Sequence, residues 1–248
     1  MNKRIFLFLL TIFIGVYSPS AKAQVLISLL LGDKLNSDWL EFGLEGGGCL
    51  LNMTNTPGSE MMLNWQLGFY FDFKVNTKLF ISTGVLVKSK MGTEGLTPYS
   101  LDNANLDTVF TGGSVQRKIN YFNVPGTVKY RFIDYLHAEG GIQLGLRYTG
   151  FDEFKQEIDG DDLEYSNDVK DNFTRLDAGG LVGLGYKLKQ GKGMGLNARY
   201  YFGLVDVNKV EAGSQHNTAF YFSASIPIGK GKAEKKAAEK ADELNKQN

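Results

Sequence analysis

Residues 136–149 read LHAEGGIQLGLRYT, and two kinds of side chain alternate along them. One set is apolar or small and consists of Leu136, Ala138, Gly140, Ile142, Leu144, Leu146 and Tyr148. The residues between them are polar, charged or glycine, and include His137, Glu139, Gln143 and Arg147. A period of two predicts a β-strand whose two faces meet different surroundings.

The same alternation recurs along the chain. It predicts eight strands at residues 39–51, 61–74, 78–92, 117–132, 136–149, 173–188, 194–205 and 217–229. In each segment every second residue, the residues of one parity, is apolar and often aromatic, as in Leu63, Trp65, Leu67, Phe69, Phe71 and Phe73. The opposite parity carries charges and amides, including Glu45, Asp72, Lys88, Lys129 and Arg199.

The connections between these segments alternate in length. Residues 52–60, 93–116, 150–172 and 206–216 form long links, whereas 75–77, 133–135 and 189–193 form short ones. Outer-membrane barrels have an even strand count, short periplasmic turns and long outside loops. The sequence therefore predicts an all-β fold, an eight-stranded antiparallel transmembrane β-barrel with long extracellular loops and short periplasmic turns. The alternative is a soluble barrel of lipocalin type, in which the apolar parity would point inward.

The first residues predict export from the cytoplasm. Lys3 and Arg4 precede the apolar run Ile5–Val16, and Ala21-Lys22-Ala23 resembles a cleavage site. The run is shorter than the roughly 20 residues of a spanning helix. We expect four parts: a signal peptide at 1–23, a periplasmic segment at 24–38, the barrel at 39–229 and a charged periplasmic tail at 230–248.

Composition argues against several classes of function. The chain has 27 basic and 27 acidic residues, so no basic face for nucleic acid is expected. A single cysteine, Cys49, excludes an internal disulfide and a CxxC metal site. Asp159–Asp162 lacks the spacing of an EF-hand, so residues 150–172 are expected to be a solvated acidic loop, with weak divalent-ion bridging to lipopolysaccharide as the alternative. We expect no cofactor and no metal site.

The inward parity carries charges that need partners. The interior of an eight-stranded barrel is just wide enough for side chains to fill it, and an isolated buried ion is very costly. The turn at 133–135 places Lys129 opposite Glu139, and Arg131 opposite His137. We expect a structural network of ion pairs in the lumen, made of Lys129, Arg131, His137, Glu139, Arg147, Arg175, Asp177 and Arg199. The alternative is a narrow polar path.

Catalysis finds little support in the sequence. The two histidines are His137 and His216, and only His216 has a serine and an acid, Ser214 and Glu211, close by in sequence. A triad requires all three side chains within hydrogen-bond reach. We therefore predict no catalytic residue.

Three stretches resemble the PorT-like outer-membrane β-barrel family of Bacteroidetes-type bacteria. They are Ile119–Tyr130 (INYFNVPGTVKY), Asp177–Tyr186 (DAGGLVGLGY) and Ala198–Asp206 (ARYYFGLVD). The resemblance covers about residues 39 to 229 and implies an eight-stranded barrel with both termini in the periplasm. It implies no single activity, although the namesake is linked to protein secretion across the outer membrane.

Taken together, these features predict a non-enzymatic outer-membrane barrel that is structural or accessory to surface or secretion processes. Its expected partners are outer-membrane lipids and a periplasmic or secretion-complex protein. The alternatives are a small polar pore and a lipid-modifying outer-membrane enzyme.

Overall fold

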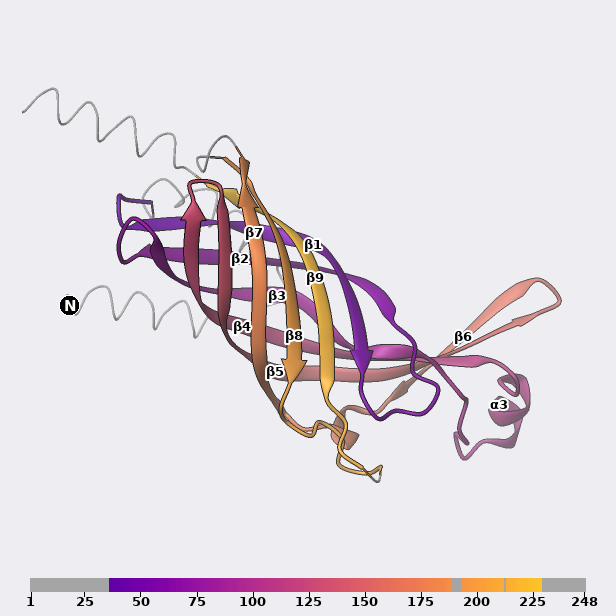
Figure 1. Cartoon of the computed structure of the whole chain (residues 1–248). Coiled ribbons are helices and arrows are strands. Elements are labelled where there is room, and N and C mark those ends of the chain that lie inside the picture. The colour runs from indigo at the N-terminus through magenta and orange to yellow at the C-terminus, as the bar shows by residue number, and fades with distance from the viewer. Residues whose placement is uncertain (1–35, 189–192, 212, 229–248) are drawn as a thin grey trace, which may run out of the picture.

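The computed structural model describes residues 36–188, 193–211 and 213–228, and eight of its strands close into a ring (Figure 1). The ring strands are β1 (Leu40–Met53), β2 (Met62–Lys74), β3 (Leu79–Leu96), β4 (Ser114–Ile133), β5 (Leu136–Ile158), β7 (Leu176–Lys187), β8 (Gly195–Gly203) and β9 (Asn217–Pro227). Each strand pairs antiparallel with the next, and β9 pairs back onto β1. The predicted eight-stranded antiparallel barrel is confirmed. The predicted signal peptide, most of the N-terminal segment and the tail lie outside the described residues.

The apolar parity of the strands points outward. On β5, Leu144 is 51% exposed, whereas the preceding residue, Gln143, is 1% exposed and lies in the lumen. Ile142, Leu184 and Phe222 are likewise exposed on the outer wall. This orientation is the reverse of a lipocalin and corresponds to a wall that faces hydrocarbon. Among the described residues, no helix is long and apolar enough to cross a membrane.

Two irregularities change which residues point inward. The pairing of β3 shifts between Leu86 and Ser89, on both of its neighbours. One extra residue in a strand reverses the facing of everything beyond it. Lys88, predicted to face the lumen, is therefore exposed on the outer wall, with Nζ 4.1 Å from the centre of the Trp65 ring. A second shift, near Tyr148 on β5, likewise reverses the facing of the residues beyond it, so that Asp152 and Phe154 are buried.

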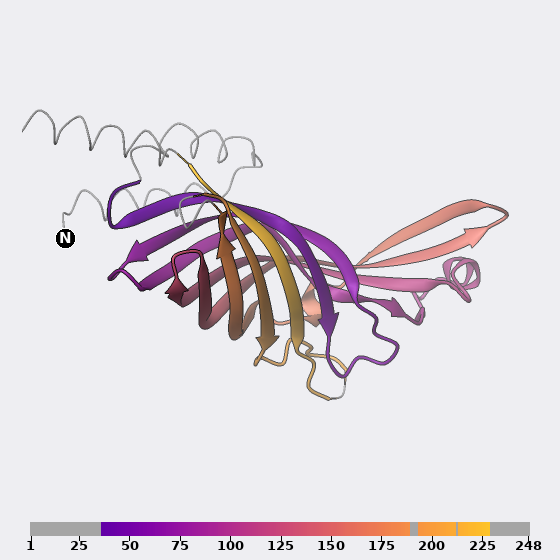
Figure 2. The same cartoon turned by 45° about the horizontal axis from the view of Figure 1, so that its top comes forward.

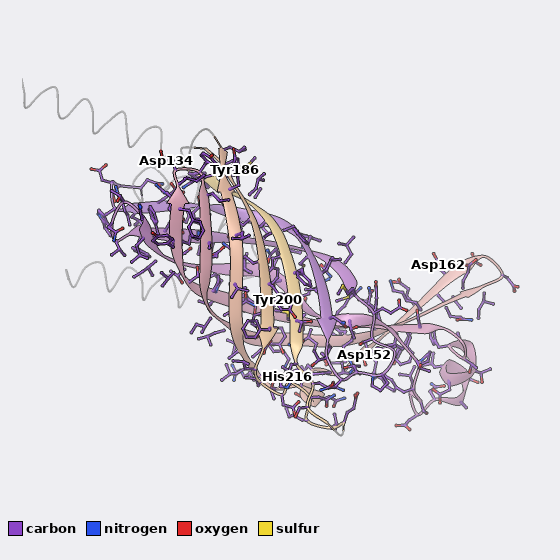
Figure 3. The ribbon with its side chains drawn as sticks, viewed as in Figure 1. Asp134, Asp152, Asp162, Tyr186, Tyr200 and His216 are labelled. Carbon is purple, nitrogen blue, oxygen red and sulfur yellow. The ribbon has the colours of Figure 1, made fainter. Side chains whose placement is uncertain are left out.

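The two ends of the barrel differ in construction. Figure 3 shows Asp134 and Tyr186 at one end, which we call the short-turn end, and Asp152 and His216 toward the other. At this second end, the long-loop end, β3, β4 and β5 continue past the neighbouring strands (Figure 2). The 93–116 link contains the helix α3 (Ala104–Val109). The 150–172 link contains β6 (Asp161–Asp168) and the short helix η2 (Lys170–Asn172).

These links form a folded unit that we call the platform, residues 93–116 and 150–172. It has its own apolar core, formed by Leu96, Phe110, Val115 and Phe154. The prediction of a loop at 150–172 is wrong, because β5 runs on to Ile158 and pairs with β6 over the whole length of β6, although most of the acidic side chains are exposed as expected. The strand continues there because the shift near Tyr148 turns Phe154 toward the platform core.

Candidate functional site

Glu139 lies at the centre of the charged network in the lumen. Arg199 of β8 donates from Nε to Glu139 Oε1 at 2.6 Å, and its Nη1 donates to Glu45 of β1. Thr127 donates to the second oxygen of Glu139 at 2.9 Å, and Ser223 donates to Glu45 at 2.7 Å. All five residues are buried. One guanidinium thus joins two carboxylates from different strands, and hydroxyl groups bond to each carboxylate.

Lys129 belongs to a separate ion pair. Its Nζ donates to both oxygens of Asp72 on β2, at 2.8 and 3.1 Å. The predicted register is confirmed, because Lys129 stands opposite Glu139 and Arg131 opposite His137. The predicted ion pair between Lys129 and Glu139 is wrong, since the long lysine stem carries its charge across β3 to Asp72. The signal that could have identified Asp72 is its place on the inward parity of β2.

The short-turn end of the lumen holds a cavity of about 490 Å³. Two of its lining residues form an ion pair, in which Lys187 donates to Glu41 at 2.6 Å. Tyr70 donates to the same carboxylate oxygen at 3.1 Å. His137 also lines the cavity, as does Arg131, whose guanidinium lies 4.4 Å from the centre of the Phe80 ring. The other charged residues lining the cavity are Asp38, Asp72, Lys74, Lys129 and Asp134. Acids and bases are balanced, so the cavity does not select one sign of charge.

Three of the predicted network residues lie elsewhere. Arg175 is exposed at the rim, one residue before β7 begins, so its placement in the lumen was wrong. Arg147 is half-buried and donates to the backbone oxygen of Thr174 at 3.2 Å. Asp177 is buried, but its partner is Asn217, which donates to it at 2.9 Å. These three therefore do not join the charged cluster around Glu139.

In the half of the lumen toward the long-loop end, apolar and aromatic side chains are buried together with polar ones such as Gln143 and Asn217. Tyr121, Tyr201 and Tyr221 point into it and are at most 1% exposed. Val169, Phe173 and Val207, from the links between strands, belong to the same cluster. Its other members are Cys49, Leu51, Met53, Met62, Met91, Ile119, Leu181 and Ala219. This layer of buried side chains lies between the charged half of the lumen and the long-loop end.

Above this layer, a buried ion pair ties the platform to the barrel. Arg117 of β4 donates from Nε and Nη2 to the two oxygens of Asp152 on β5, each at 2.9 Å. The Arg117 side chain is 7% exposed and that of Asp152 is 0% exposed. Arg117 also donates to Glu211, at 3.3 Å, which connects the platform with the 206–216 link. Sequence reasoning missed this pair because it placed residue 152 in a solvated loop.

Tyr99 completes this cluster from the 93–116 link. Its hydroxyl donates to Asp152 at 3.0 Å and accepts a hydrogen bond from Asn167 of β6 at 3.0 Å. Burial, and then the neighbouring carboxylate of Asp152, raise the pKa of Tyr99 from 10.0 to about 12. A neutral tyrosine hydroxyl therefore joins three segments of the platform.

The two histidines lie at opposite ends of the barrel. His216 has Nδ1 2.9 Å from the backbone oxygen of Val205. His137 lies at the opposite end of the barrel, in the charged cavity. Within residues 36–188, 193–211 and 213–228, no group of three His, Cys, Asp or Glu side chains is placed to hold a metal ion.

A family model described as "Outer membrane protein beta-barrel domain" matches residues 36–209. The chain belongs to this family. It is an outer-membrane protein, in agreement with a closed barrel whose apolar side chains face outward. No curated protein matches the sequence significantly.

Several solved outer-membrane barrels are similar to this chain at low sequence identity. Ail, the attachment invasion locus protein of Yersinia pestis, has a TM-score of 0.40 and 11% identity, covering 77% of this chain and 100% of that chain. Neisserial surface protein A has a TM-score of 0.41 and 10% identity, over 75% and 97%. OprG from Pseudomonas aeruginosa has a TM-score of 0.31 and 10% identity, over 76% and 91%.

Proposed function

We propose that this protein is a closed, non-enzymatic outer-membrane barrel that displays its platform on the cell surface and acts as an accessory to a surface or secretion process. The observation that carries the proposal is the packed outer half of the lumen. Tyr121, Tyr201 and Tyr221 are buried there, and Phe173 belongs to the same cluster. A barrel closed in this way acts through its surfaces rather than through a channel.

The resemblance to the PorT-like family supports the secretion part of the proposal. The stretch Ile119–Tyr130 forms the middle of β4, and Asp177–Tyr186 forms most of β7. The namesake of that family is linked to secretion across the outer membrane. We therefore propose outer-membrane lipids as partners of the barrel wall, and a periplasmic or secretion-complex protein as a partner of its short-turn end.

A small polar pore is the second candidate, because the cavity of about 490 Å³ provides half of a path. Planar-bilayer recording of the refolded chain separates the two functions. We expect no steady conductance from the wild type, and openings from a Tyr121→Ala/Tyr221→Ala variant, in which part of the packed layer is removed. A stable open conductance in the wild type would place the pore first.

A lipid-modifying enzyme is the third candidate, and the positions of the two histidines give it the least support. His216 directs Nδ1 to the Val205 backbone, and His137 lies among the charges of the cavity. We expect no release of fatty acid or lysolipid when the refolded protein is incubated with outer-membrane lipids. Activity that is lost in His216→Asn would overturn the non-enzymatic assignment.

A further inference from the structure

We propose that the free edge of β6 binds an extended, positively charged segment of a partner protein, which adds to the sheet as a further strand. This inference rests on the proposed function, because it requires the platform to face outside. It assigns a class of partner to the surface that the barrel displays.

The backbone of β6 is paired on one side only. All eight of its residues, Asp161–Asp168, pair with β5, from Ile158↔Asp161 to Phe151↔Asp168. On its other side β6 pairs with none of the described strands. The hairpin projects away from the ring, and Asp162 lies far out along it (Figure 3). An unpaired row of N–H and C=O groups is a template for another strand.

Acidic charge is the one feature present at this edge by which proteins usually prevent pairing. Natural edges are protected by charged side chains, lysine above all, and by proline, bulges or short length. The sequence of β6, DDLEYSND, has neither proline nor lysine, and its register with β5 runs without a shift. An uninterrupted edge of this length offers main-chain hydrogen bonds to an extended chain.

The side chains of β6 determine which chain fits. Four of its eight residues are acidic, so a second copy of the same edge would meet like charges, which destabilise strand pairs. Asp162 and Glu164 share one face of the strand, and Leu163 and Tyr165 share the other. Tyr165 lies 6.4 Å from the rings of both Phe110 and Phe154. A matching segment alternates Lys or Arg with apolar residues.

The neighbouring strand strengthens this preference. On the face of Asp162 and Glu164, β5 contributes Glu157, one base, Lys155, and Glu153, whose carboxylate already pairs with Lys118 of β4. Lys155 lies 3.2 Å from Glu164, but both side chains are well exposed. An exposed ion pair contributes little, so it leaves the acidic face available to a basic segment.

The test is a binding titration on the refolded full chain. The probe is an eight-residue labelled peptide of alternating lysine and valine, equal in length to β6. The control peptide has the same charge, with proline in place of each valine, so it cannot form a strand. We expect saturable binding of the first peptide only, measured by fluorescence anisotropy. Equal binding of both peptides would overturn strand addition.

Two variants test the place of binding. Asp162→Asn/Glu164→Gln removes two charges beside the edge, and we expect binding about three- to tenfold weaker. Asp38→Asn/Asp134→Asn removes two exposed charges at the short-turn end and should leave binding unchanged. A heat-modifiability gel checks that both variants fold. Equal affinities for the two variants would overturn the assignment to β6.

Amide exchange gives a readout of the backbone itself. Strand addition should slow exchange at alternate residues of β6, those whose N–H points away from β5. Binding without this pattern would show charge attraction alone and overturn the inference. Failure here is distinct from failure of the proposed function, because conductance reports on the lumen, whereas peptide binding reports on the platform.

Discussion

Lys129 and Glu139 stand directly opposite each other across β4 and β5, yet their charged groups bind elsewhere. Lys129 pairs with Asp72 on β2, and Glu139 pairs with Arg199 on β8. The two inner charges thus connect four strands of the ring instead of joining one hairpin. The network holds together strands that are far apart in sequence.

The first prediction concerns the partners in this network. Removing one member of a buried ion pair leaves an unpaired charge and costs about 3–5 kcal/mol. Glu139→Ala and Arg199→Ala should each cost about this much, and the double variant less than their sum, because the stranded charge disappears with its partner. Urea unfolding in detergent measures the cycle. A larger coupling between Lys129 and Glu139 than between Arg199 and Glu139 would contradict the observed pairing.

The second prediction concerns the outer wall. Leu144 lies near mid-strand on β5, whereas Leu63 lies at the long-loop end of β2, and both side chains are exposed. Leu144→Arg should cost about 2–4 kcal/mol, and Leu63→Arg about 0–1 kcal/mol, because the cost of a charge depends on its depth in the bilayer. Unfolding in lipid vesicles tests this difference. Equal costs in lipid would contradict the membrane position of the wall.

The third prediction is a pH dependence of the platform. The folded pKa of Tyr99, about 12, lies above its ordinary value of 10.0. The stabilisation by its neutral hydroxyl is therefore complete below pH 10.0 and is lost as the pH rises through about 12. We expect Tyr99→Phe to lack this loss in near-ultraviolet circular dichroism. An identical alkaline transition in wild type and variant would show that another group is responsible.

The fold could be predicted from the sequence because side-chain direction alternates with the backbone. Residues 136–149 showed both faces of β5, and the short turns set the register of Lys129 against Glu139. Two things could not be predicted. The irregularity before Ser89 reverses the facing of Lys88 without any change in composition, and the partners of Lys129 and Glu139 come from strands that only ring closure brings near.

The platform shows the same limit for the candidate site. Its acidic residues suggested a solvated loop, and most of them are indeed exposed. The exception, Asp152, is fully buried because the shift near Tyr148 turns it toward Arg117. The composition of residues 150–172 describes their average exposure. The burial of Asp152 depends instead on one residue and on the register of β5 near Tyr148.

The last prediction tests whether this ion pair holds the platform in place. Arg117→Gln leaves the Asp152 carboxylate buried without its bidentate partner, and we expect a local loss of about 3–5 kcal/mol. The matched control is the next residue, Lys118, which pairs with Glu153 on the more exposed outer face. Because the Lys118 and Glu153 side chains are 18% and 27% exposed, water reaches the carboxylate that loses its partner, and Lys118→Gln should cost clearly less than Arg117→Gln.

Limited proteolysis of the refolded protein measures the difference between these two variants. Cleavage within 93–116 and 150–172 should be much faster in Arg117→Gln than in Lys118→Gln, while the barrel fragment stays intact. Arg117→Gln/Asp152→Asn should recover part of the protection, because it also removes the buried charge. Equal cleavage in Arg117→Gln and Lys118→Gln would show that the apolar core around Phe154 holds the platform without the ion pair.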